Sequence, residues 1–184
     1  MQCRSTSDAG AGPSPLRESE PTGALSLPTG RGRYVLLLEV VTGVSFPVRS
    51  GATFDLRAGT YAYVGSAAGS GGVAARVSRH LRRAKQPHWH IDHLLMRAEV
   101  RAVVCFGLQV GECALAGHLE NVLGGSPVPG FGCSDCRCPS HLFLLPKGLG
   151  ACELAASVEQ AQAKPPGSVL GLFVLGDGTR TGPP

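Results

Sequence analysis

The apolar positions of the chain fall first into β-prone runs. Residues 34–41 are almost continuously apolar, and Thr42-Gly43 has the character of a turn into residues 44–48, which predicts an opening β-hairpin. Residues 53–57 are expected to be a short connection. Residues 60–65 alternate between two faces, which predicts the next or central strand of the same sheet.

An amphipathic helix is predicted after the glycine-rich segment 65–72. Its apolar positions recur every three or four residues, and its polar positions form the opposite stripe. The apolar stripe comprises Val73, Ala74, Val77 and Leu81, and the opposite stripe comprises Arg76, Arg79, His80 and Arg83. Gln86-Pro87 ends this helix, and a shorter one is expected at residues 91–95.

The second half of the chain continues the alternation of strands and helices. We expect a strand at residues 100–106, a helix at 112–123 and a last core strand at 141–145. Residues 153–163 predict a helix. Residues 168–175 predict a strand, which either docks on the sheet or belongs to a loose appendage.

Composition divides the chain into one domain and two tails. Residues 1–30 are rich in Ser, Pro, Gly and Ala without periodicity, which predicts a disordered tail. Residues 31–146 are the expected folded domain, and residues 147–184 an extension expected to be partly ordered. No apolar run resembles a signal segment or approaches the roughly 20 residues of a membrane span. We therefore expect an intracellular, soluble protein with no membrane partner; the sequence does not distinguish cytoplasm from nucleus.

Positive charge is concentrated in one segment. Residues 76–101 hold seven cations and two acids, a net charge of +5, whereas the whole chain carries +4. Such a focused potential favours a polyanionic partner, and the excess of Arg over Lys favours phosphate, which guanidinium groups bind in a bidentate manner. An ordinary solvated helix face is the alternative. The candidate nucleic-acid contacts are Arg79, Arg82, Arg83, Lys85, His88 and Arg97.

Two groups of side chains have the composition of metal sites. The seven cysteines are an odd number, which favours reduced thiols over a disulfide framework. Four soft ligands fall within nine residues, a set that suits tetrahedral Zn²⁺, with packed, reduced thiols as the alternative: Cys133, Cys136, Cys138 and His141. His88, His90 and His93 with Asp92 form a second group, for which DNA contact or buried hydrogen bonding is the alternative.

Several motifs resemble those of the GIY-YIG nuclease superfamily. They are Gly32-Arg33-Tyr34, Tyr63-Val64-Gly65, Arg76-Val77-Ser78-Arg79-His80-Leu81 and Glu112. The chain is similar, more narrowly, to an uncharacterised branch whose members are sometimes fused to endonuclease III-type glycosylases. That similarity is carried by Tyr61-Ala62-Tyr63-Val64-Gly65-Ser66-Ala67, Pro87-His88-Trp89-His90-Ile91-Asp92, Glu112-Cys113-Ala114-Leu115, and Gly130-Phe131-Gly132 with Ser134-Asp135-Cys136. The resemblance covers residues 32–146.

The resemblance implies a small α/β domain with a central, mostly antiparallel three-stranded sheet flanked by helices. It also implies an endonuclease that uses Mg²⁺ or Mn²⁺. By position, Tyr34 matches the proposed general base, Tyr63 the tyrosine that orients it or the water, Arg76 the phosphate-binding arginine, His80 its helix neighbour and Glu112 the metal ligand. Gly65 is expected to allow a tight backbone turn beside the site. The 28 residues between the two tyrosines imply an inserted loop or extra strand.

Each of these residues has a structural alternative. The tyrosines are also typical half-buried strand aromatics, Arg76 suits a solvated helix, and Glu112 suits the first turn of a helix. The leading hypothesis is an endonuclease acting on nucleic acid, with DNA in a repair context expected and a repair protein as a candidate partner. The sequence does not distinguish DNA from RNA as the substrate, and it does not determine the oligomeric state. A non-catalytic nucleic-acid-binding module with the same fold is the second hypothesis, and a zinc-stabilised interaction protein is the third.

Overall fold

The middle of the fold is one long strand paired on both edges. The computed structural model describes residues 26–48, 51–82, 84, 86–161 and 168–175. Strand β1 (Gly32–Val40) pairs antiparallel with β4 (Gly59–Ala67) along one edge and with β5 (Glu99–Phe106) along the other. Its side chains are buried on both faces, which explains why its sequence is continuously apolar rather than alternating.

The main sheet has six strands in the order β6-β7-β4-β1-β5-β8. The α/β class and the mostly antiparallel sheet are confirmed, but the expected number of three strands is wrong. Strands β4, β1 and β5 form its centre. Three short strands extend the sheet: β6 (Ser126–Pro127), β7 (Leu142–Leu144) and β8 (Val169–Val174). Hydrogen bonding to these strands covers the edges of β4 and β5 that a three-stranded sheet would leave open.

The predicted opening hairpin does not form. Strand β2 (Val44–Pro47) pairs with β3 (Thr53–Leu56) in a separate two-stranded sheet, so residues 53–57 are not a simple connection either. Both edges of β1 are already occupied, which leaves none for β2. The β2–β3 hairpin is the extra structure implied by the long interval between the two tyrosine motifs, and it leaves β1 and β4 free to pair directly.

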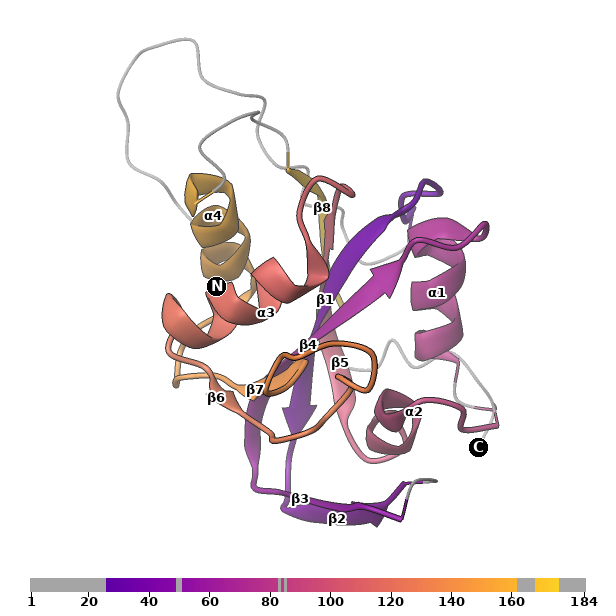
Figure 1. Cartoon of the computed structure of the whole chain (residues 1–184), viewed down its shortest axis with the longest axis vertical. Coiled ribbons are helices and arrows are strands. Elements are labelled where there is room, and N and C mark those ends of the chain that lie inside the picture. Colours follow the sequence, from indigo (N-terminus) through magenta and orange to yellow (C-terminus); the bar gives the residue numbers. More distant parts are fainter. Residues whose placement is uncertain (1–25, 49–50, 83, 85, 162–167, 176–184) are drawn as a thin grey trace, which may run out of the picture.

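Helices cover both faces of the main sheet (Figure 1). On one face, α1 (Gly72–Leu81), α2 (His90–Leu95) and the β2–β3 hairpin share a core with alternate side chains of β1, beginning at Tyr34. On the other face, α3 (Glu112–Asn121) and α4 (Ala151–Ala161) pack on the intervening side chains, such as Val35 and Leu37. The period-two alternation of the strands thus builds two cores from one sheet.

The segment after residue 146 is part of this architecture. Strand β8 pairs with β5, so of the two alternatives for residues 168–175 the docked strand is the one observed. Helix α4 begins two residues earlier than predicted. Residues 1–25, 162–167 and 176–184 lie outside the described residues, and with them most of the predicted disordered tail and part of the predicted extension. Among the helices described, none is long and apolar enough to cross a membrane.

Candidate active site

The two tyrosine motifs meet on neighbouring strands. In the register of β1 and β4, Tyr34 lies directly opposite Gly65, and Tyr63 lies opposite Leu36. A Cβ atom added at Gly65 would lie 2.3–2.6 Å from three atoms of the Tyr34 ring. The glycine is therefore needed for the space it leaves, which the ring of Tyr34 fills. The expected tight turn at Gly65 is wrong, because this residue lies within an extended strand.

Tyr34 is the first member of a buried polar chain. Its hydroxyl is 2.7 Å from Nε2 of His80, and Nδ1 of His80 is 3.7 Å from a carboxylate oxygen of Asp92. His80 is buried, so its predicted place on the polar stripe of the helix is wrong. Polar groups on both sides of the ring explain how an imidazole can occupy the apolar face of α1.

Asp92 collects donors from three directions. Arg79 Nη1 lies 2.9 and 3.0 Å from its two oxygens, and the backbone amides of His88 and Trp89 donate to it at 3.0 and 3.1 Å. Burial alone would raise the pKa of Asp92, but hydrogen bonds from His80, these two amides and Arg79 hold the pKa well below its usual range. Asp92 is therefore a carboxylate, and it joins α1 to the start of α2.

Trp89 organises the cationic face of the site. The guanidinium carbons of Arg76 and Arg79 lie 4.2 and 4.3 Å from the centre of its ring, distances typical of cation–π contact. Arg79 is bound to Asp92 at the same time, so a carboxylate balances its charge, and its contact with nucleic acid stays a prediction. Arg76 lines a pocket next to the tyrosines.

This pocket, of about 390 Å³, brings together side chains from β1, β4, α1 and α3. All five residues predicted to be catalytic line it, together with His88: Tyr34, Tyr63, Arg76, His80 and Glu112. The residues that sequence analysis did not assign to the site are Ser66, Trp89, His90, Gly132, Ser134 and Asp135. The pocket is therefore polar, and its lining includes one arginine, Arg76, and two carboxylates, Glu112 and Asp135.

Both tyrosines of the pocket are held as neutral phenols. Burial raises the pKa of Tyr34 well above its ordinary value, and the negative charge that Tyr63 would acquire on ionising raises it further. Burial and the carboxylate of Glu112 likewise raise the pKa of Tyr63. Arg76 opposes the shift in both cases without reversing it. A phenolate waiting to accept a proton is therefore not the resting state of either residue.

The remaining predicted nucleic-acid contacts are more scattered. Arg82 is exposed just past the end of α1. Arg97 donates to the backbone carbonyl of His93 and lies over the ring of Phe46, away from the residues that line the pocket. Arg83 and Lys85 lie outside the described residues.

Glu112 begins α3 and faces two groups. It lines the pocket, and its Oε1 is 3.4 Å from Nδ1 of His141. The Glu112 carboxylate raises the pKa of the His141 imidazole, despite burial of the ring, which opposes this. The acid at this position thus links the pocket to the cysteine-rich loop before β7.

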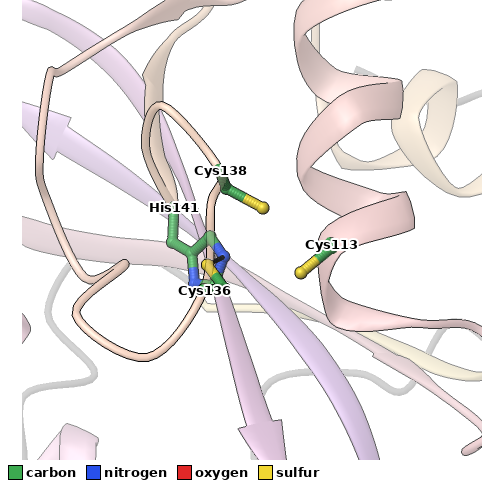
Figure 2. A group of neighbouring side chains, drawn as sticks. All are labelled: Cys113, Cys136, Cys138 and His141. Carbon is green, nitrogen blue, oxygen red and sulfur yellow. Dashed lines mark hydrogen bonds between the residues drawn. The ribbon is translucent and has the colours of Figure 1, made fainter.

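Three thiols and the imidazole of His141 converge beside the pocket, and this cluster can hold a metal ion. The ligand atoms of Cys113, Cys136, Cys138 and His141 all lie within 4.8 Å of one another, and Figure 2 shows Cys113 reaching from the start of α3 towards the loop. Cys133, one of the predicted zinc ligands, is not a member. Its backbone carbonyl accepts the amide of Cys136, and its thiol lies 3.9 Å from the backbone carbonyl oxygen of Pro139.

The thiols of this cluster differ in acidity. Burial would raise the pKa of Cys136, but hydrogen bonds from the Cys138 amide and thiol, the positive charge of His141 and the Cys113 thiol lower it. Burial and the neighbouring thiols of Cys113 and Cys136 raise the pKa of Cys138 to about 12. The Cys136 thiol is therefore more readily ionised than the Cys138 thiol.

Some of these residues carried a recognisable signal in the sequence. Trp89 and Asp92 lie in the motif after Pro87, and a tryptophan beside an arginine-rich helix is typical of cation–π contact. Cys113 follows Glu112 directly, but nothing in a sequence shows which separated cysteine completes a cluster. Asp135 precedes Cys136 in another of the motifs, and its position in the sequence does not indicate that it lines the pocket.

The sequence profile of one protein family matches more than half of the chain. Its description is "Domain of unknown function DUF123", and it covers residues 33–163, from the start of β1 to just beyond α4. No curated protein and no solved structure shows a significant match to the chain.

Proposed function

We propose that this chain, which belongs to the DUF123 family, is a metal-dependent endonuclease that hydrolyses phosphodiester bonds. In this proposal the fold is GIY-YIG-like and the substrate is DNA in a repair context. The observation that carries the proposal is the convergence of two tyrosines, an arginine, a histidine and a glutamate in one pocket. These side chains come from four separate elements, and ordinary core packing does not require charged and phenolic groups to meet there.

Arg76 is the phosphate-binding group. Stacking on Trp89 restricts the guanidinium to one plane, so less conformational freedom is lost when it binds phosphate oxygens. His88 contributes a second donor at the rim of the same pocket. Because Arg79 is neutralised by Asp92, the charge offered to the substrate centres on Arg76 and the exposed Arg82.

His80 is the terminal proton acceptor. When the water oxygen attacks phosphorus, one phosphorus–oxygen bond forms and the bond to the leaving oxygen breaks, and the water gives up a proton. Tyr34 takes this proton as it passes its own to Nε2 of His80, 2.7 Å away. The Asp92 carboxylate favours a proton on Nδ1, which leaves Nε2 as the acceptor. Tyr63 orients the water, and the leaving oxygen takes a proton from solvent.

This relay removes a difficulty with a tyrosine base. A phenol whose pKa is raised by burial does not ionise at neutral pH, but it transfers a proton without first becoming a free phenolate if an imidazole accepts its own. The role of Tyr34 changes accordingly, from a resting base to a proton carrier between water and His80.

Glu112 is the proposed ligand for Mg²⁺ or Mn²⁺. Mg²⁺ is usually held by one or two carboxylates together with substrate phosphate oxygens and water, and Asp135 supplies a second carboxylate at the same pocket. The donor set therefore fits a hard cation. When bound, the ion would neutralise charge developing on the phosphate and acidify water. Zn²⁺, a softer ion, belongs instead at the thiol cluster.

A nuclease assay with matched variants tests the proposal. The full chain is incubated with branched, nicked and linear DNA, and with RNA of the same sequences, in Mg²⁺ or in EDTA. We expect metal-dependent cleavage that Glu112→Gln and Arg76→Ala each reduce at least 100-fold. Glu120→Gln on the same helix and Arg101→Ala on β5, neither of which lines the pocket, should retain cutting. Equal cleavage by all four variants would contradict the assigned site.

The raised pKa values of both tyrosines favour one alternative, a nucleic-acid-binding module that does not cut. Such a module would bind DNA equally in Mg²⁺ and in EDTA. Its affinity would fall with salt by about 0.9 logarithmic units per phosphate contact. Binding without any cleavage, lost in Arg76→Ala and unaffected by Glu112→Gln, would establish the module in place of the enzyme.

A further inference from the structure

We propose that Cys113, Cys136, Cys138 and His141 bind one Zn²⁺ ion in a closed structural site that fastens the start of α3 to the loop before β7. The proposal is independent of nuclease activity. It differs from the ligand set that the sequence suggests, because a cysteine from the beginning of α3 takes the place of Cys133.

The spacing of the ligand atoms is that of a single ion. A tetrahedral Zn²⁺ with bonds of about 2.3 Å to sulfur places its ligands about 3.8 Å apart. The four ligand atoms lie within 4.8 Å of one another, and Cys136 Sγ and His141 Nε2 are 3.4 Å apart. Figure 2 shows Cys113 approaching from the helix and the other three side chains from the loop, so the ligands surround a common centre.

His141 is oriented as metal-ligating histidines usually are. Its Nε2 faces Cys136, whereas its Nδ1 faces the Glu112 carboxylate at 3.4 Å. Histidine ligands to zinc typically donate their second ring proton to a carboxylate or carbonyl, which fixes the tautomer and turns the free lone pair to the metal. His141 is also buried, so the ring has little room to rotate.

The donor set indicates which metal binds. Three thiols and one imidazole are typical of structural Zn²⁺ sites, and a hard cation such as Mg²⁺ would prefer oxygen. With four protein ligands, no coordination position remains for a reacting water. An iron–sulfur cluster would distribute the ligands over two irons, which suits a wider set of donors than this one.

Binding would fix one wall of the pocket. Cys113 directly follows Glu112 in α3, and Cys136 directly follows Asp135 in the loop. At both places a proposed zinc ligand is therefore next in sequence to a carboxylate that lines the pocket. Without a metal, these two segments are joined by hydrogen bonds among the thiols, by packing of Cys138 against the apolar cluster that includes α3, and by the contact between Glu112 and His141. The ion therefore cross-links the two segments as a disulfide would, and it sets the distance between the carboxylates of Glu112 and Asp135.

Metal content measured on the purified full chain tests the site. We expect one zinc per chain by elemental analysis of protein grown without added metal. Cys113→Ser and Cys138→Ser should each lose it, and Cys133→Ser, the matched control in the same loop, should retain it. Glu112→Gln should keep zinc but release it to a chelator 10- to 100-fold more readily, because only the partner of His141 changes.

A second measurement, on the wild-type chain, tests the site even if the cysteine variants do not fold. The wild-type chain, stripped of metal under reducing conditions, is titrated with Co²⁺, which should give the visible spectrum of a tetrahedral site with thiolate ligands and saturate at one equivalent. Zinc retained by Cys113→Ser but lost by Cys133→Ser would overturn this ligand set. Absence of zinc together with no Co²⁺ spectrum, or a coloured iron–sulfur protein, would overturn the site. None of these results depends on cleavage of DNA.

Discussion

Replacing Gly65 by alanine tests whether the strand register of β1 and β4 creates the space for Tyr34. The added Cβ would lie 2.3 Å from Cζ, 2.4 Å from the hydroxyl oxygen and 2.6 Å from Cε2 of that ring. Ordinary contact begins at 3.4 Å, so the ring has to move by about 1.1 Å. Such a shift takes the 2.7 Å bond from Tyr34 to His80 beyond the roughly 3.2 Å limit of a good hydrogen bond.

The expected loss of stability follows from these two effects. Forcing extra volume into a packed core costs about 1–3 kcal/mol. Loss of a buried hydrogen bond costs about 1–3 kcal/mol more. We therefore expect the free energy of unfolding of Gly65→Ala to fall by about 2–6 kcal/mol, measured by urea denaturation. This is opposite in sign to the usual small gain when glycine in a strand-compatible conformation is replaced by alanine.

Two controls separate the steric effect from a general one. Gly69→Ala adds a Cβ with no atom within 4 Å and should change the stability by less than about 0.5 kcal/mol. In a Tyr34→Phe background the hydrogen bond is already absent, so Gly65→Ala should cost about 1–2 kcal/mol less than in the wild type. A Gly65→Ala variant as stable as the wild type would contradict the inference that the ring of Tyr34 fills the space left by this glycine.

Three further predictions concern the buried polar chain and the cationic face. Tyr34→Phe should bind DNA within about twofold of wild type but cut at least 100-fold more slowly; undiminished cutting would disprove the relay to His80. Asp92→Asn should lower the free energy of unfolding by about 2–3 kcal/mol at pH 7, less than for a fully buried pair because Arg79 is 29% exposed. Since the folded pKa of Asp92 is depressed, its contribution is present above the unfolded value of about 3.9 and lost as pH falls below it. The stability difference between wild type and variant should therefore shrink in acid, and a difference independent of pH down to 2 would contradict this. Trp89→Leu should weaken DNA binding about two- to fivefold by releasing Arg76, measured by anisotropy of labelled DNA; unchanged affinity would mean that the stacking is dispensable.

Local patterns in the sequence determined the elements near the site. The apolar run that begins at Tyr34, the alternation up to Gly65 and the three- and four-residue spacing in α1 each depend on neighbours in the chain, so they were predictable. Arg76 and Glu112 belong to motifs that resemble a nuclease pattern, and the structure brings both into one pocket. Their catalytic roles stay a prediction.

Only the tertiary structure decided which elements pair and which side chains meet. The pairing of β1 with β4 rather than with β2 depends on hydrogen-bonding edges that distant segments occupy. His80 lies seven residues after Val73 and therefore on the same helical face, but only the structure shows that Tyr34 and Asp92 supply the polar partners of a histidine buried there. The replacement of Cys133 by Cys113 likewise depends on where α3 begins relative to a loop more than 20 residues away in the sequence. A sequence specifies local preferences strongly, whereas contacts between distant residues are fixed only when the whole core closes.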